Sequence, residues 1–282
     1  MQMIDAHCHF WNPARGDYGW LMAGHASLDP LRQVFAPADL AALNGGARVV
    51  AVQAADSVAE TEYLLELAAQ NPQIAGVVGW VDLASANAAQ DISRLAQHPL
   101  LRGLRPMLQD IADSRWILTA PKDEAISAMI SHGLCFDALV QTRHLEHLAE
   151  FAARLPDLPI VIDHCAKPEM GGDITKEWRD GMAALASQPH VMCKLSGLLT
   201  ELPKGHADPL AALRPVVEWV VNLFGPNRVM WGSDWPVLTL ASSYEGWARM
   251  TDTLLAGLSV SDRAAIMGQT AAKFYGLGRA DA

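Results

Sequence analysis

The chain has 282 residues, of which 51% are hydrophobic and 18% are charged, and its formal net charge is −10. This composition is ordinary for a well-packed globular protein, and the negative charge argues against nucleic acid and anionic membrane surfaces as partners. The N-terminus lacks the basic region and apolar core of a secretory signal, and no apolar run reaches the length of about 18 residues that spans a membrane. We therefore expect a cytoplasmic protein.

Eight short apolar segments predict strands. They recur along the whole chain at intervals that leave room for a helix after each, and most are nearly continuous in apolar residues. Parallel strands that are covered on both faces have this pattern. The predicted strands span residues 3–9, 47–54, 74–81, 101–108, 134–140, 159–165, 190–197 and 228–235.

The stretches between the strands have helical spacing. Helices are predicted over 58–70, 143–155 and 208–225, where Pro215 should kink or divide the last of them. Alternating strands and helices indicate a parallel sheet, and eight such units favour a closed (β/α)8 TIM barrel over an open sheet. We expect one domain over 1–282, with the Trp-, Gly- and Pro-rich segment 10–46 as an excursion over the barrel mouth.

Polar residues follow nearly every predicted strand, although the strand interiors are apolar. Catalytic groups of such barrels lie at the carboxyl ends of the strands. His7 and His9 end the first strand, and because side chains alternate along a strand they should share a face, with Cys8 opposite. The later strands end with or carry Gln53, Arg105, Gln109, Gln141, His164, Lys167, Lys194, Ser196 and Asp234.

The four cysteines are Cys8, Cys135, Cys165 and Cys193. Each lies in an apolar, strand-like segment, and no CxxC pair occurs. We interpret them as reduced thiols of the core rather than as disulfide or catalytic residues.

Three segments resemble those of one enzyme group. "DAHCHFW" near the start, "VIDHCAKP" in the middle and "MWGSDWPV" near the end are similar to motifs of the amidohydrolase superfamily. The similarity is greatest to its lactonase branch, which includes fuconolactone and rhamnonolactone hydrolases and relatives that act on pyrone and muconate lactones. The fold of that family is also a (β/α)8 barrel.

The resemblance implies roles for individual residues. His7, His9, His164 and Asp234 match positions that can hold a divalent metal, and Asp234 matches the carboxylate that activates water. Arg105 and Gln109 match residues near the substrate. The fourth strand has no lysine and the fifth ends in Gln141 rather than histidine, with His144 on the following helix, so at most one ion is expected. Neutral imidazoles and a carboxylate suit zinc.

Three further side chains have two interpretations each. Gln53 and Lys167 either contact the substrate or serve the structure, in the case of Lys167 by capping a loop. Trp116 either walls the substrate pocket or anchors its loop. We include all three among the candidate substrate contacts.

These residues supply what lactone hydrolysis needs. Asp234 can take a proton from water and return it, and His164 can be a metal ligand or a second donor. A metal can polarise the carbonyl group, and Arg105 can do so in its absence. The expected function is hydrolysis of a small sugar-derived lactone. The alternatives are a metal-dependent decarboxylase of an aromatic acid, which Asp5 would support if it faced inward beside His7, and a catalytically inactive binding barrel, against which Asp234 argues.

Overall fold

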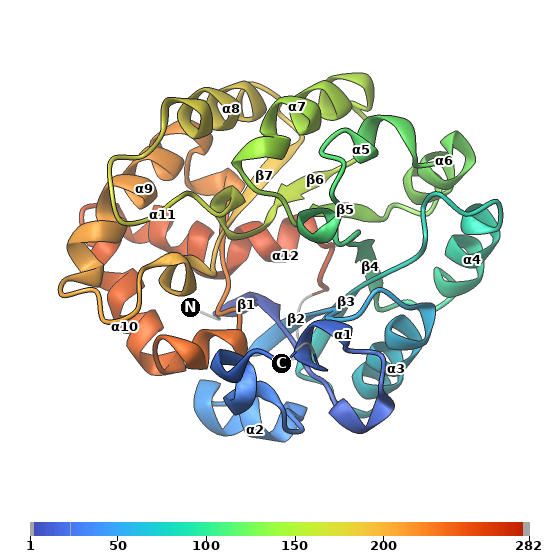
Figure 1. Cartoon of the computed structure of the whole chain (residues 1–282), viewed down its shortest axis with the longest axis horizontal. Coiled ribbons are helices and arrows are strands. Elements are labelled where there is room, and N and C mark those ends of the chain that lie inside the picture. The colour runs from blue at the N-terminus through green and yellow to red at the C-terminus, as the bar shows by residue number, and fades with distance from the viewer. Residues whose placement is uncertain (1–2, 23, 279–282) are drawn as a thin grey trace.

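Eight parallel strands form a nearly closed barrel, and they follow chain order around the ring with helices outside it (Figure 1). The computed structural model describes residues 3–22 and 24–278. The predicted fold and all eight predicted strands are confirmed. The strands are β1 (Ile4–Cys8), β2 (Arg48–Val52), β3 (Ile74–Gly79), β4 (Leu101–Leu104), β5 (Cys135–Ala138), β6 (Ile160–Ile162), β7 (Val191–Leu195) and β8 (Val229–Trp231).

The helices form the outer layer of the barrel. They are α1 (Gly19–Met22), α2 (Pro37–Asn44), α3 (Val58–Gln70), α4 (Ala88–Leu95), α5 (Trp116–Thr119), α6 (Asp123–Ser131), α7 (Leu145–Arg154), α8 (Lys176–Ala186), α9 (Pro209–Phe224), α10 (Tyr244–Leu254), α11 (Val260–Ala264) and α12 (Thr270–Phe274). Pro215 lies inside α9 without dividing it. The prediction that His144 lies on the helix after the fifth strand is wrong, because His144 ends a 3-10 turn directly before α7. No described helix is both long and apolar enough to cross a membrane.

The first and last strands close the ring just beyond their ends. The backbone amide of Asp234 donates to the carbonyl of His7 over 2.8 Å, and the amide of His9 donates to the carbonyl of Trp235 over 2.7 Å. Segments more than 200 residues apart in sequence are thus joined through the backbones of His7, His9 and Asp234, three of the candidate site residues.

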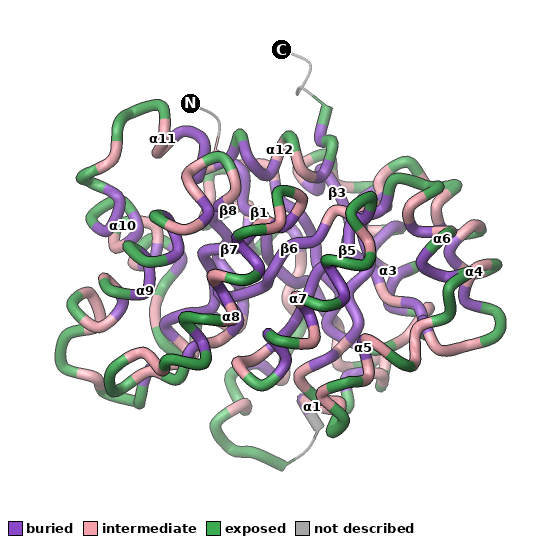
Figure 2. The backbone as a smooth tube through the Cα atoms, turned by 90° about the horizontal axis from the view of Figure 1, so that it is seen from above, coloured by how far each residue is buried: buried purple, intermediate pink, exposed green. Residues whose placement is uncertain are grey.

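The core has two layers. One lies between the strands and the surrounding helices and includes Cys8, Val49 and Ala51. The other is the barrel interior, where Val50 and Val52 of the same strand pack with Tyr275. The two faces of each strand therefore pack in different layers, and Figure 2 shows the strands mostly buried, with exposed positions on the outer helices and loops.

Two charged residues contradict the prediction of apolar strand interiors. Asp137 lies inside β5 and Lys194 inside β7, and both side chains are fully buried. The four cysteines, in contrast, are buried free thiols as predicted.

The segment 10–46 has a small core of its own. Trp11, Tyr18, Leu21 and Leu31 are buried together against Ala54 and Ala55. The hydroxyl of Tyr18 donates to the buried carboxylate of Glu60 over 2.7 Å, and the indole of Trp20 donates to the carbonyl of Ala54. These contacts hold the segment against the residues that connect β2 to α3.

Candidate active site

A bulge in β1 determines how the first histidines point. Asp5 pairs with Val49 and Cys8 with Ala51, so three steps along β1 match two steps along β2. An extra residue of this kind changes the face to which the following side chains point. The imidazoles of His7 and His9 consequently meet inside the barrel, with their Nε2 atoms 3.2 Å apart, while Cys8 packs in the outer layer.

Asp5 does not join the two histidines. Its Oδ1 accepts hydrogen bonds from the backbone amides of Ser233, over 2.8 Å, and of His7, over 3.1 Å. Burial raises the pKa of Asp5 to about 6, against the lowering effect of these bonds. Asp5 also belongs to neither cluster of possible metal ligands among the described residues. The inward orientation that would have supported a decarboxylase is therefore not observed.

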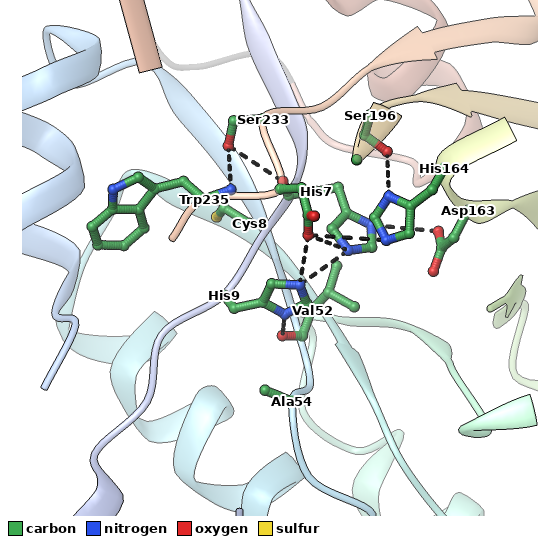
Figure 3. A network of polar contacts seen from close by, with 12 residues as sticks. His7, Cys8, His9, Val52, Ala54, Asp163, His164, Ser196, Ser233 and Trp235 are labelled. Carbon is green, nitrogen blue, oxygen red and sulfur yellow. Dashed lines mark hydrogen bonds and ion pairs between the residues drawn. The ribbon is translucent and has the colours of Figure 1, made fainter. Parts of the chain in front are cut away.

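Four side chains from the carboxyl ends of three strands converge on one point. Asp234 Oδ1 lies 3.2 Å from His9 Nε2, 3.8 Å from His7 Nε2 and 3.9 Å from His164 Nε2. Figure 3 shows the three imidazoles turned toward one another. The structure thus brings together all four residues that the sequence predicted as metal ligands.

The backbone on either side of this cluster has an unusual conformation. His164, Cys165, Ala166 and Lys167 all have positive φ angles between 46° and 58°, and Asp234 has a φ of 59°. Non-glycine residues rarely adopt this left-handed region, and such strain is concentrated at functional sites. The turns also explain why β6 and β8 end before His164 and Asp234.

Hydrogen bonds fix the orientation of the rings. His9 Nδ1 lies 2.8 Å from the carbonyl oxygen of Val52, and because a carbonyl only accepts, this nitrogen carries the proton. His164 Nδ1 lies 2.9 Å from the hydroxyl of Ser196. His7 Nδ1 lies 3.1 Å from the ammonium of Lys194 and 3.4 Å from Asp163. The Nε2 atoms are therefore the ones that face Asp234.

The residues present fit a divalent metal. The neutral form of His9 has a lone pair on Nε2, which faces an oxygen of Asp234 only 3.2 Å away, and a cation beside both atoms would remove their repulsion. Ligands about 2.0–2.1 Å from zinc are separated by about 3.3–3.4 Å in a tetrahedron. His9 Nε2 lies 3.2 Å from both His7 Nε2 and Asp234 Oδ1, close to this separation, while His7 and His164 lie somewhat farther from Asp234, at 3.8 and 3.9 Å. On the other side of the His7 ring, Nδ1 lies between the ammonium of Lys194 at 3.1 Å and the carboxylate of Asp163 at 3.4 Å, so charged partners would orient a ring that held a metal through Nε2.

The electrostatics favour neutral His7 and His164 and an ionised Asp234. Burial lowers the pKa of His164 to about 4, although Asp234 pulls it upward. Burial and the neighbouring ammonium of Lys194 hold the pKa of His7 well below its usual value. Burial also pushes the pKa of Asp234 upward, but the histidines outweigh this and keep it below its usual range. The cluster therefore offers lone pairs and one negative charge at neutral pH.

A buried ionic network lies next to His7, and sequence reasoning did not find it. The ammonium of Lys194 donates to Asp137 and lies 3.1 Å from Asp163, while the hydroxyl of Tyr275 donates to Asp137 over 2.7 Å. Burial would raise the pKa of Asp163, but Lys194 lowers it well below the usual value. The available signal was the presence of Asp137 and Lys194 inside otherwise apolar strands.

Arg105 and Gln53 bind each other's backbone. The side-chain amide nitrogen of Gln53, Nε2, donates to the backbone carbonyl of Arg105 over 2.7 Å, and the guanidinium of Arg105 donates to the backbone carbonyl of Gln53. The same guanidinium lies 3.4 Å from Asp163. This reciprocal pair joins the ends of β2 and β4 and fixes Arg105 beside the histidine cluster.

A cavity of about 200 Å³ opens above the cluster. His9, Arg105, His164 and Asp234 give it one polar wall, and the predicted Gln109 and Lys167 also line it. Among the described residues, Gln53 and Trp116 are not part of the lining, since Gln53 is fully buried beneath it and Trp116 packs against the core from α5. The remaining lining residues are Trp11, Trp20, Ala54, Met107, Asp110, Leu139 and Val237.

A (β/α)8 barrel that gathers histidines, a carboxylate and an arginine in one cavity at the carboxyl ends of its strands has the architecture of a barrel enzyme. Residues 4–277 match the family model described as amidohydrolase, and the chain belongs to this family. The resemblance predicted from the three sequence motifs is thereby confirmed.

Named relatives cover almost the whole chain. It is 44% identical to an L-fucono-1,5-lactonase of Burkholderia ambifaria, over 98% of this chain and 96% of that protein. It is 38% identical to an L-fucono-1,5-lactonase of Burkholderia multivorans, over 97% and 96% of the two chains. A crystal structure of a Burkholderia multivorans amidohydrolase with bound zinc superposes with a TM-score of 0.90 at 35% identity, over 99% of this chain and 100% of that one.

Proposed function

We propose that this protein is a lactonase that opens a small, neutral, sugar-derived lactone, and that L-fucono-1,5-lactone is the first substrate to test. The observation that carries the proposal is the convergence of Asp234, His164 and Arg105 on one small cavity. The names of the relatives at 44% and 38% identity support the same substrate class.

The walls of the cavity favour a neutral substrate. Arg105 already faces Asp163 at 3.4 Å, and Lys167 faces Glu201 at 3.5 Å. The described lining therefore offers no unpaired cation for a substrate carboxylate, which an aromatic acid would bring. Trp11 and Trp20 present flat apolar surfaces that suit the C–H faces and methyl group of a deoxy sugar.

Asp234 is proposed as the general base. Its carboxylate is ionised, is held by three imidazoles, and lines the cavity from which water reaches it. Because its pKa is low, it removes a proton effectively only from an acidified water, and lowering the pKa of water is the chemistry that a divalent ion on His7, His9, His164 and Asp234 would supply.

The other side chains act on the substrate itself. Arg105 is held rigidly by Gln53 and Asp163, so its guanidinium can stabilise negative charge on the carbonyl oxygen as water attacks. His164 is neutral and lies 3.9 Å from Asp234. It can therefore share the proton that Asp234 takes from water before that proton reaches the departing ring oxygen.

The test is a pH-indicator assay of purified protein against a panel of sugar lactones, with L-fucono-1,5-lactone included, before and after treatment with a chelator. We expect acid release with at least one sugar lactone. Asp234→Asn keeps the shape of the side chain but cannot accept the proton, so a folded variant should retain only a small fraction of the turnover. Activity equal to the parent would contradict the role of Asp234, and inertness of the parent toward all sugar lactones would contradict the function.

A further inference from the structure

The segment that follows β4 supplies several residues to the lining of the substrate cavity but has little regular secondary structure. Met107, Gln109 and Asp110 all line the cavity, and the only helical element among them is a three-residue 3-10 turn, Leu108–Asp110. Gln109 is half-buried and Asp110 is exposed. We call residues 107–112 the substrate arm. Backbone carbonyls in such a segment need partners outside it.

One side chain provides these partners. Arg143 lies in the 3-10 turn Thr142–His144 that follows β5. Its guanidinium donates to the carbonyls of Gln109 over 3.0 Å, Ile111 over 3.1 Å and Ala112 over 3.3 Å. Its Nε donates to the side-chain oxygen of Gln141 over 3.3 Å, which orients the planar group. All three guanidinium nitrogens are thus used.

Arg143 acts on the arm and not on the substrate. It is not among the described residues that line the catalytic cavity. Three carbonyl oxygens converge on it at an exposed position, so one side chain restrains the arm at three points. The fixed fork of an arginine can serve several acceptors at once, whereas a lysine offers a single point charge on a flexible stem.

We propose that Arg143 is a positioning residue that holds the substrate arm so that Gln109 and Asp110 can bind hydroxyl groups of the substrate. A carboxylate accepts hydrogen bonds from two neighbouring hydroxyls, and an amide both donates and accepts. The negative charge of Asp110 also disfavours lactones that carry a carboxylate. The arm therefore selects polyhydroxylated neutral lactones, and this half of the inference rests on the proposed function.

Hydrogen exchange of the intact protein tests the clamp. In Arg143→Ala, the backbone amides of residues 108–113 should exchange at least about tenfold faster than in the parent, because the arm opens more often. Arg143→Lys should be intermediate. Arg249→Ala is the matched control, since Arg249 is an exposed arginine whose ionic partner among the described residues is Glu245 on its own helix, α10. Unchanged exchange in Arg143→Ala would overturn the clamp.

Kinetics test the recognition of hydroxyl groups. With the sugar lactone that the parent hydrolyses, Arg143→Ala and Asp110→Asn should each raise KM about tenfold and change kcat little, because lost substrate binding and not lost chemistry is expected. Free guanidinium at millimolar concentration should partly restore KM in Arg143→Ala alone. Faster exchange with an unchanged KM would overturn the recognition role. A parent that hydrolyses no sugar lactone would refute the proposed function and the recognition role with it, whereas the exchange measurement still decides the clamp.

Discussion

A methyl group at position 197 should impair catalysis through His164. Gly197 is the second residue after β7 and has a φ of +64°, and a Cβ there would lie 2.5 Å from His164 Nδ1 and 2.6 Å from its Cγ. Ordinary contact begins near 3.4 Å, so the ring or the turn must move by about 0.9 Å in Gly197→Ala. A displacement of about 1 Å in an active site can cost about a hundredfold in rate.

The left-handed backbone adds a cost in stability. An alanine in this conformation loses about 1 kcal/mol or more, which lowers the melting temperature of a domain of this size by about 2–4 °C. Gly133 provides the control, because its φ is +65° and a Cβ there would meet no atom within 4 Å. Both variants should melt earlier than the parent, but only Gly197→Ala should lose turnover.

The assay measures lactone hydrolysis and thermal unfolding for the two variants side by side. The decisive quantity is the turnover of Gly197→Ala relative to that of Gly133→Ala. If the two folded variants have similar turnover, the close packing beneath His164 does not determine its catalytic position, and the reasoning is refuted.

Three other predictions concern charge, pH and metal. Arg105→Lys keeps the charge but loses the fork that Asp163 and Gln53 hold, so kcat/KM for a sugar lactone should fall by about tenfold or more; a value equal to the parent would exclude the guanidinium from transition-state binding. Burial raises the pKa of Glu60 to about 7, above its usual 4.5. Its contribution to stability is therefore complete below pH 4.5 and is lost as the pH rises through 7. Between pH 4 and 8 the melting temperature of Glu60→Gln should fall less than that of the parent, and parallel curves would contradict this. Metal analysis of protein purified without chelator should find at most one ion per chain, and His9→Ala should lower that content; two ions per chain would contradict a mononuclear site.

Strand and helix periodicity predicted the barrel well because the strands are buried on both faces and nearly every carboxyl end carries a polar residue. The same reasoning located His7, His9, His164 and Asp234, since few polar residues are flanked by such apolar sequence. It did not reveal the left-handed turns, because neither "DHCAK" nor "GSDW" contains glycine at the strained positions.

Other errors came from orientation, which a one-dimensional pattern does not specify. The β1 bulge leaves the apolar pattern of "MIDAHCH" unbroken, so Asp5 and His7 were expected to be able to share a face. Gln53 does follow its strand, but its side chain points away from the cavity and donates to the backbone carbonyl of Arg105. Its strand-end position alone could not distinguish these two directions.

The pairing of β1 with the loop after β8 also affects how the protein acquires its site. The amides of His9 and Asp234 that close the ring belong to the residues that face each other in the cavity. Without the residues that follow β8, the chain has His7, His9 and His164 but lacks the carboxylate and the hydrogen bonds that join β1 to the end of β8. Assembly of the site is therefore coupled to closure of the barrel. A ligand that binds the cluster would stabilise the closed ring specifically, by mass action.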